Sequence, residues 1–159
     1  MKIGVISDSH DNIVNVKKVI EIFNKEGIDT VLHLGDIISP FVVPFLNVKM
    51  VYAVFGNNDG DKLLLQKRFE KRGFRIKKGP FAISIRGKKL LLMHEPFQAM
   101  RFREEDFDFI FFGHTHKIYV KEGDTLILNP GELGGWLTGK ATFAIIDLES
   151  NNYLIRELG

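Results

Sequence analysis

The sequence predicts an α/β protein in which two β-sheets pack against each other, with helices outside both, in one domain over residues 1–159. Two observations carry this prediction. The first half of the chain alternates strand-like and helix-like runs, which implies right-handed crossovers and a largely parallel sheet. The second half consists mostly of short strand-like runs broken by Gly, Asp or Asn turns, which indicates antiparallel pairs.

The first half predicts three strands that alternate with helices. Apolar residues recur at helical spacing from Ile13 to Phe23, and Gly27 ends that helix. A charged amphipathic helix later in the half stops at Gly73. The basic residues within 67–78 are interpreted as an exposed helix face followed by a turn. The predicted strands are residues 2–7, 30–34 and 49–55, and further helices cover residues 41–46 and 61–72.

The second half predicts short strands with one short helix among them. Two apolar runs flank the single Gly87, which is typical of a β-hairpin. The short helix covers residues 96–103 and precedes the central strand of this half. The predicted strands are residues 81–86, 88–93, 108–112, 118–121, 125–128, 142–147 and 153–157.

Composition and charge exclude several functional classes. The 22 basic residues nearly balance the 20 acidic ones, so charge gives no case for a nucleic-acid or membrane surface. The absence of cysteine excludes a thiolate zinc site and a cysteine nucleophile. The first apolar stretch is too short for a signal-peptide core, and no run reaches the length of a membrane span. We therefore expect a cytoplasmic protein without a membrane partner.

Polar side chains that can bind metals follow five of the predicted strands. The carboxyl ends of parallel strands meet at one edge of a sheet, so loops there can bring distant residues together. Imidazoles, carboxylates and a carboxamide are ligands that suit divalent cations. The sequence therefore predicts a site for two divalent cations at the carboxyl ends of the strands. The candidate ligands are Asp8, His10, Asp36, Asn57, His94, His114 and His116.

Each short motif also has a structural interpretation. Asp8 could cap the helix that follows it, and Asp36 could be an ordinary turn residue. Asn57 lies in an Asn-rich turn, and Asn is common in turns because it tolerates left-handed backbone. A lone histidine after an apolar strand, such as His94, is more often a hydrogen-bonding residue than a ligand. His33 lies within the second strand, and we expect it to hydrogen-bond behind the ligands rather than to bind metal.

Taken together, the motifs resemble those of the calcineurin-like metallophosphoesterase superfamily. That family has the pattern D-x-H, G-D, G-N-[HCN]-[DE], a strand-terminal His and G-H-x-H, and all five blocks occur here in that order. The short length, the G-N-N-D block and the Asn129-Pro130-Gly131 turn are similar to the small, single-domain phosphodiesterase branch. That branch is also similar to a retromer subunit of the same fold, which is a protein scaffold. The resemblance covers the chain from Lys2 to about Asp147.

The resemblance implies a four-layer α/β/β/α sandwich with two mixed sheets and two metals at the carboxyl ends of the strands. It also implies that Asp36 bridges the metals. We expect two divalent transition-metal ions, manganese first and nickel, cobalt, iron or zinc as alternatives, because imidazoles and carboxylates suit these ions. The first metal would be held by Asp8, His10, Asp36 and His116, and the second by Asp36, Asn57, His94 and His114.

The implied chemistry is hydrolysis of a phosphodiester by a hydroxide that bridges the metals. Two cations roughly 3.5–4 Å apart can share a hydroxide and hold a phosphoryl oxygen, so no side-chain nucleophile is needed. Many family members have a His directly after the ligand Asn, placed to protonate the leaving oxygen. Here that position is Asn58, which we expect to contact the substrate without acting as a general acid. The chain also has His94-Glu95-Pro96 where relatives often have H-G-H, and Glu132 where Ser is frequent.

The sequence therefore predicts a binuclear metal-dependent phosphodiesterase that hydrolyses a small-molecule diester, faster on activated diesters than on monoesters. Whether it forms a homodimer is left open. The alternative is a non-catalytic interaction scaffold of the same fold, which the intact ligand set argues against. A nucleotide-binding α/β domain is excluded because the first strand is followed by neither G-x-G-x-x-G nor a P-loop. A partner surface for a scaffold would use Phe41, Phe45, Phe97, Phe102 and Trp136.

Overall fold

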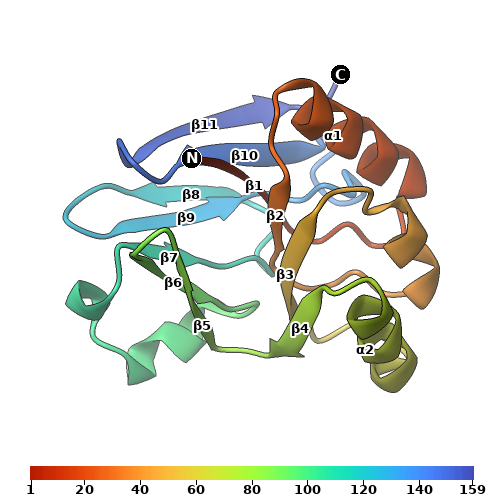
Figure 1. The fold of residues 1–159 in the computed structure, drawn as a ribbon, viewed down its shortest axis with the longest axis horizontal. Helices are drawn as coiled ribbons and strands as arrows, with labels where there is room; N and C mark the ends of the chain where they lie inside the picture. Colours follow the sequence, from red (N-terminus) through yellow and green to blue (C-terminus); the bar gives the residue numbers. More distant parts are fainter.

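Two mixed β-sheets face each other in the computed structural model, which describes residues 1–159 (Figure 1). In the six-stranded sheet, β1 to β4 run parallel, while β10 and β11 continue the sheet as antiparallel neighbours. The strand order is β11-β10-β1-β2-β3-β4. The strands are Lys2–Ile6 (β1), Thr30–His33 (β2), Met50–Phe55 (β3), Arg75–Lys78 (β4), Thr142–Asp147 (β10) and Asn152–Glu157 (β11).

The five-stranded sheet has the order β5-β6-β7-β9-β8. Its central strands β6, β7 and β9 are parallel, and β5 and β8 pair antiparallel at the two edges. The hairpin predicted around Gly87 joins β5 to β6, with Arg86 and Gly87 both at positive φ, as a tight two-residue turn requires. The strands are Phe81–Ile85 (β5), Lys88–Leu92 (β6), Phe109–Phe111 (β7), Ile118–Lys121 (β8) and Leu126–Pro130 (β9).

Two α-helices and one 3₁₀ helix cover the outer face of the six-stranded sheet, on the right of Figure 1. Helix α1 starts after Asn12, whose side chain accepts a hydrogen bond from the backbone N–H of Asn15. Its buried residues recur at the helical spacing found in the sequence. None of the helices is both long and apolar enough to cross a membrane. The elements are Ile13–Lys25 (α1), Pro40–Phe45 (η1) and Lys62–Lys71 (α2).

The outer face of the five-stranded sheet carries a thinner layer. The helix predicted over residues 96–103 is a 3₁₀ helix, η2 (Pro96–Arg101), and a second 3₁₀ turn, η3 (Glu104–Asp106), follows it. Apolar residues of the sheet pack beneath Ala99 and Phe107 from this segment. The α/β class and the two mixed sheets are thus as predicted, with short 3₁₀ turns forming the fourth layer.

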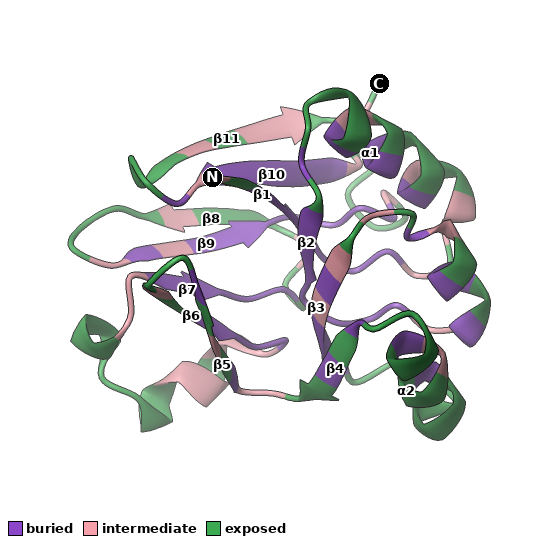
Figure 2. Cartoon of the chain, in the orientation of Figure 1, coloured by how far each residue is buried: buried purple, intermediate pink, exposed green.

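Apolar clusters separate these layers, and the purple strands at the centre of Figure 2 are buried on both faces. One cluster lies between the helices and the six-stranded sheet, and another fills the space between the two sheets. Consecutive strand residues enter different clusters, as Val5 lies between the sheets and Ile6 lies under the helices. This burial on both faces explains why the strands appear in the sequence as unbroken apolar runs.

Strand β4 differs from the sequence prediction, which placed an exposed helix face and a turn across residues 67–78. The segment Arg75–Lys78 pairs in parallel with β3 instead. Only Ile76 of its four residues is buried, because β4 forms an edge of the sheet. Lysines on an edge strand discourage pairing with another chain, and they also hide the strand pattern in the sequence.

The parallel strands of both sheets end at the same side of the molecule. Ile6 at the end of β1 is in register with His33 at the end of β2. In the other sheet, Leu92 at the end of β6 is in register with Phe111 at the end of β7. The loops that leave these strands therefore meet at one edge, where the candidate ligands lie.

Replacing Gly4 by alanine should destabilise the protein. A Cβ at Gly4 in β1 would lie 2.5 Å from Cζ of Phe23, whose ring packs edge-on against Phe143. Because the ring would have to shift inside a filled core, we expect the free energy of unfolding to fall by about 1–3 kcal/mol. Urea denaturation measures this, with Gly123→Ala as the control because a Cβ there meets nothing closer than 3.8 Å. Equal midpoints for the two variants would contradict the expectation.

Candidate metal centre

The seven side chains predicted as ligands converge from loops of both sheets. Asp8 and His10 follow β1, Asp36 follows β2, and Asn57 follows β3. The remaining ligands follow the five-stranded sheet, with His94 after β6 and His114 and His116 after β7. Two groups form, and they share one residue.

The first group consists of Asp8, His10, Asp36 and His116, whose candidate ligand atoms lie within 4.8 Å of one another. The Oδ1 atom of Asp8 lies 3.4 Å from Nε2 of His116 and 3.8 Å from Nε2 of His10. The Oδ2 atom of Asp36 lies 3.4 Å from Nε2 of His10. Two carboxylate oxygens and two ring nitrogens thus surround one small space.

The second group lies on the other side of the Asp36 carboxylate. The same Oδ2 atom of Asp36 is 3.5 Å from Nε2 of His94. The Oδ1 atom of Asn57 is 2.9 Å from Nε2 of His94 and 3.0 Å from Nδ1 of His114, and these two nitrogens are 3.3 Å apart. One oxygen of Asp36 therefore faces both groups, as a bridging ligand would.

A hydrogen bond behind His94 decides which of its ring nitrogens faces the site. Nδ1 of His94 donates to the backbone oxygen of Leu34 at 2.7 Å, so in the neutral ring Nε2 carries the lone pair. That lone pair faces Oδ1 of Asn57, which is also an acceptor. Two acceptors at this distance repel each other unless a proton or a metal ion lies between them, and a metal bound here would accept both lone pairs.

Two buried atoms of the first group lack any hydrogen-bond partner. They are Oδ1 of Asp8 and Nε2 of His10. The other oxygen of Asp8 is satisfied, since it accepts hydrogen bonds from Oγ of Ser7 at 2.5 Å and from the backbone N–H of His114 at 3.0 Å. Buried polar atoms are rarely left unpaired. The residues therefore fit a divalent cation that would bind these two atoms.

The electrostatics also favour positive charge at this position. Burial acts to raise the pKa of Asp36, but contact with His94 and hydrogen bonds from Asn58 outweigh it and hold the pKa below its usual range. The neighbouring Asp8 carboxylate raises the pKa of His10 against the effect of burial. Burial acts to lower the pKa of His94, yet the carboxylates of Asp36 and Asp8 raise it. The buried carboxylates thus stabilise cations nearby.

The backbone is strained at the same residues. Five candidate ligands have φ between 43° and 65°, in the left-handed region. Such conformations cost on the order of 1–3 kcal/mol each and persist only where the surroundings enforce them. Here the loops hold each other, since the backbone N–H of Asp8 donates to Gly35 and that of His10 donates to Asp36. The five residues are Asp8, His10, Asp36, His114 and His116.

Two glycines allow the loops to approach this closely. Gly35 has a φ of +98°, and a Cβ there would lie 2.6 Å from Nδ1 of His94. A Cβ at Gly56 would collide with the Asp36 carboxylate and its backbone nitrogen. Space therefore requires glycine before both Asp36 and Asn57, and the left-handed backbone at Gly35 favours glycine as well.

Glu132 is a residue of the site that the ligand motifs did not include. It is fully buried, and its Oε2 atom accepts a hydrogen bond at 3.0 Å from Nδ1 of His116. Its carboxylate also accepts backbone hydrogen bonds from Trp136, Leu137 and Thr138. The signal in the sequence is that Glu132 is the only charged residue within 125–139. Glu132 orients His116 so that Nε2 faces Asp8.

Asn58 and His33 lie beside the two groups. The backbone N–H and the Nδ2 atom of Asn58 donate to the two oxygens of Asp36, both at 2.9 Å, so its amide is bound to a candidate ligand. His33 is buried, and its Nε2 lies 2.9 Å from Oγ of Ser9. Burial lowers the pKa of His33 to about 4, which keeps the ring neutral. His33 lies outside both groups, where we expected it.

A sequence model of the calcineurin-like phosphoesterase superfamily domain matches residues 1–151. The chain belongs to this superfamily. It is 37% identical over 160 residues to a phosphodiesterase of Methanocaldococcus jannaschii, with 96% of each protein covered. The superfamily resemblance inferred from the five motif blocks is thereby confirmed.

Solved structures agree with this assignment. The fold matches that of an archaeal phosphodiesterase with a TM-score of 0.90 and 36% identity, over 99% of this chain and 100% of the other. It is also similar to Vacuolar Protein Sorting 29 from Cryptosporidium parvum, with a TM-score of 0.68 and 22% identity, over 98% and 95% of the two chains. The second likeness shows the fold alone. Superfamily members use divalent metals, and the first group described above can hold one.

Glu132→Gln should weaken metal binding by about 10–100-fold, the usual effect of losing a carboxylate behind a ligand histidine. The amide can still accept hydrogen bonds from the backbone but no longer attracts the ring proton of His116 as a charged group. Calorimetric titration of metal-free protein with Mn²⁺ measures the affinity. Glu21→Gln on the exposed face of α1 is the control. An unchanged Mn²⁺ affinity in Glu132→Gln would contradict a role for Glu132 in orienting His116.

Proposed function

We propose that the protein is a metal-dependent phosphodiesterase with two divalent transition-metal ions, manganese first. The observation that carries this proposal is the shared oxygen of Asp36, which lies 3.4 Å from Nε2 of His10 and 3.5 Å from Nε2 of His94. The first ion would be held by Asp8, His10, Asp36 and His116, and the second by Asp36, Asn57, His94 and His114. The superfamily and the phosphodiesterase relative support hydrolysis of phosphoesters.

Two ions bound here would supply an activated water and neutralise charge on the phosphoryl group. The burial of the candidate ligands determines from which side a substrate can reach the ions. Asp8, Asp36 and His94 are buried, whereas Asn57 and His114 are exposed. The second group therefore opens to solvent, and the substrate would approach from that side.

A diester is the favoured substrate because the chain lacks an obvious proton donor for the leaving oxygen. Asn58 takes the position where many relatives have His, and an amide does not donate a proton at ordinary pH. Its Nδ2 atom binds Asp36, so substrate contact by Asn58 would use its Oδ1 atom or a rotated side chain. Esters with good leaving groups need little protonation and should react fastest.

The scaffold alternative has less support. The convergence of all seven candidate ligands supports the enzyme, whereas a scaffold has no need of them. Of the five aromatic residues proposed for a partner surface, four are exposed and Phe45 is half-buried. Exposure of this set is compatible with either function, so the support for the enzyme comes from the candidate ligands. The exposed residues are Phe41, Phe97, Phe102 and Trp136.

We also propose that residues 1–159 form one domain and that the protein acts in the cytoplasm. The superfamily match ends at residue 151, but β11 (Asn152–Glu157) completes the six-stranded sheet beside β10. The final strand therefore belongs with the rest of the fold. The lack of cysteine is compatible with a reducing compartment.

Metal-free protein should hydrolyse bis(p-nitrophenyl) phosphate only after Mn²⁺ or a related ion is restored. Because both groups depend on Asp36, Asp36→Ala should lower kcat/KM by about 10²–10³-fold or more. The measurement is release of p-nitrophenolate after EDTA treatment and titration with Mn²⁺, Ni²⁺, Co²⁺, Zn²⁺ and Mg²⁺. Hydrolysis that resists EDTA, or that is unaffected in Asp36→Ala, would refute the proposal. No hydrolysis with any ion would favour the scaffold.

Asn58→His should restore a general acid and change which esters react. We expect diesters with poor leaving groups, such as dialkyl phosphates, to gain about 10²-fold. Bis(p-nitrophenyl) phosphate should gain little, because p-nitrophenolate leaves without protonation. Asn58→Ala is the matched control, since it removes the side-chain hydrogen bond to Asp36 without adding an acid. A similar gain on all esters would contradict this explanation.

A further inference from the structure

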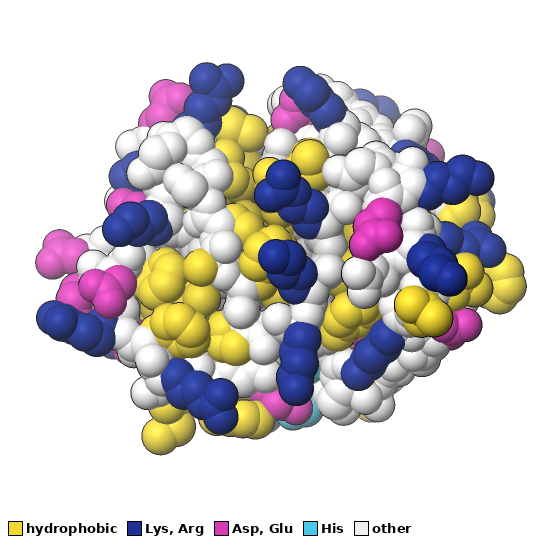
Figure 3. All heavy atoms as spheres, turned by 60° about the horizontal axis from the view of Figure 1, so that its bottom comes forward, with side chains coloured by type: hydrophobic (Ala, Val, Ile, Leu, Met, Phe, Trp, Pro, Cys, Tyr) yellow, Lys and Arg dark blue, Asp and Glu magenta, His cyan; other side chains and the backbone are white.

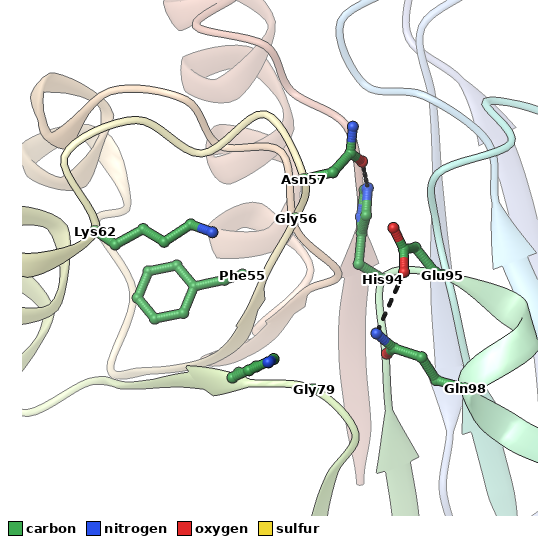
Figure 4. Close-up of a pocket in the computed structure, with 9 residues that line it drawn as sticks. Phe55, Gly56, Asn57, Lys62, Gly79, His94, Glu95 and Gln98 are labelled. Atoms are coloured by element: carbon green, nitrogen blue, oxygen red, sulfur yellow. Dashed lines mark hydrogen bonds between the residues drawn. The ribbon is translucent and has the colours of Figure 1, made fainter. Parts of the chain in front are cut away.

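A cleft lies next to the candidate metal centre and shares two of its residues. Its volume is about 280 Å³, and Asn57 and His94 line it. The other lining residues come from the end of β3, the start of α2, the end of β4 and the segment after β6 (Figure 4). A substrate held at the open side of the metal centre would therefore extend into this cleft.

Two lysines of the cleft have no acidic partner. Lys62 and Lys78 line it, and neither forms an ion pair or a side-chain hydrogen bond within the chain. Figure 4 shows the amine of Lys62 reaching from α2 toward the side of Asn57, beside the ring of Phe55. Its Nζ lies 5.8 Å from the centroid of that ring. We call this the lysine cleft.

The opposite wall of the lysine cleft offers hydrogen-bond acceptors. Glu95 and Gln98 lie across from Lys62, with Nε2 of Gln98 donating to Oε2 of Glu95 at 3.5 Å (Figure 4). The Oε1 atom of Gln98 is buried and has no partner. This wall therefore brings a single negative charge to the cleft, the carboxylate of Glu95.

The lysine cleft carries more positive charge than is needed to neutralise a simple phosphodiester. A phosphodiester carries one negative charge, and the metal centre would already neutralise it. The two lysines outnumber the single carboxylate of Glu95, so the cleft stays positive and can bind another anion. Figure 3, which brings the lower side of the molecule forward, shows basic side chains that stand apart on that face and form no continuous stripe. This distribution favours a compact anion over a long nucleic-acid backbone.

We propose that the lysine cleft binds one ester arm of the substrate, a small group that carries a second anion such as a phosphate. The inference rests on the proposed phosphodiesterase function and names its substrate class. The volume of about 280 Å³ lies at the small end of ligand sites and suits a sugar-sized arm. Lys62 and Lys78 would bind the second anion.

The test compares two diesters with the same leaving group. They are thymidine 5′-(p-nitrophenyl phosphate) and the same ester carrying a 3′-phosphate. With metal-loaded protein we expect kcat/KM to be at least about tenfold higher for the 3′-phosphorylated ester, as one charge-assisted hydrogen bond to phosphate would give. In the double variant Lys62→Gln, Lys78→Gln this ratio should fall to about one. Lys67→Gln on the same helix is the control and should keep the ratio, because Lys67 is exposed and outside the cleft.

The outcomes separate this inference from the proposed function. Equal kcat/KM for the two esters, or a preference that survives in the double variant, would refute binding of a second anion in the lysine cleft. Hydrolysis of bis(p-nitrophenyl) phosphate would still support the proposed phosphodiesterase function. If that diester is not hydrolysed at all, the proposed function fails. Calorimetry with thymidine 3′,5′-bisphosphate and thymidine 5′-phosphate then tests whether the lysine cleft binds the second phosphate. Tighter binding of the bisphosphate that is lost in the double variant supports it, and equal affinities overturn it.

Discussion

The buried carboxylate of Asp36 is the group on which the candidate site depends. Its Oδ2 atom lies within 3.5 Å of ring nitrogens from both ligand groups, so the two groups meet at one oxygen. A carboxylate in this position is unfavourable unless donors or positive charge surround it. Asn58 supplies two donors, and the remaining side of the carboxylate faces histidine nitrogens that fit cations. The need for positive charge at Asp36 links the fold to the proposed chemistry.

The packing of the two sheets places the ligands around Asp36. Loops from β1, β2 and β3 bring four of them, and loops from β6 and β7 bring the other three across the space between the sheets. This convergence requires strained, left-handed backbone at five of the candidate ligands. They are Asp8, His10, Asp36, His114 and His116. Hydrogen bonds between the loops offset this strain, and a bound cation would offset more of it. The candidate ligands are therefore held together by the fold itself.

Much of this arrangement could be predicted from sequence because the strands are buried on both faces. Runs such as residues 3–6 are apolar throughout, so the polar residues that follow, Asp8 and His10, stand out at the strand ends. Glu132 could not be assigned in this way, since it meets His116 only through the fold of the loop after β9. Strand β4 was missed because a single residue, Ile76, is buried in it. The lysine cleft joins four segments, and no short motif encodes it.

In the proposed site, two metal ions share the Asp36 carboxylate. Electron paramagnetic resonance of metal-free protein titrated with Mn²⁺ detects such sharing. With two equivalents bound per chain, we expect the multiline spectrum of a coupled Mn²⁺ pair, and we expect Asp36→Ala to abolish the coupling. A spectrum of isolated Mn²⁺ at two bound equivalents, or saturation at a single Mn²⁺ per chain, would contradict such sharing.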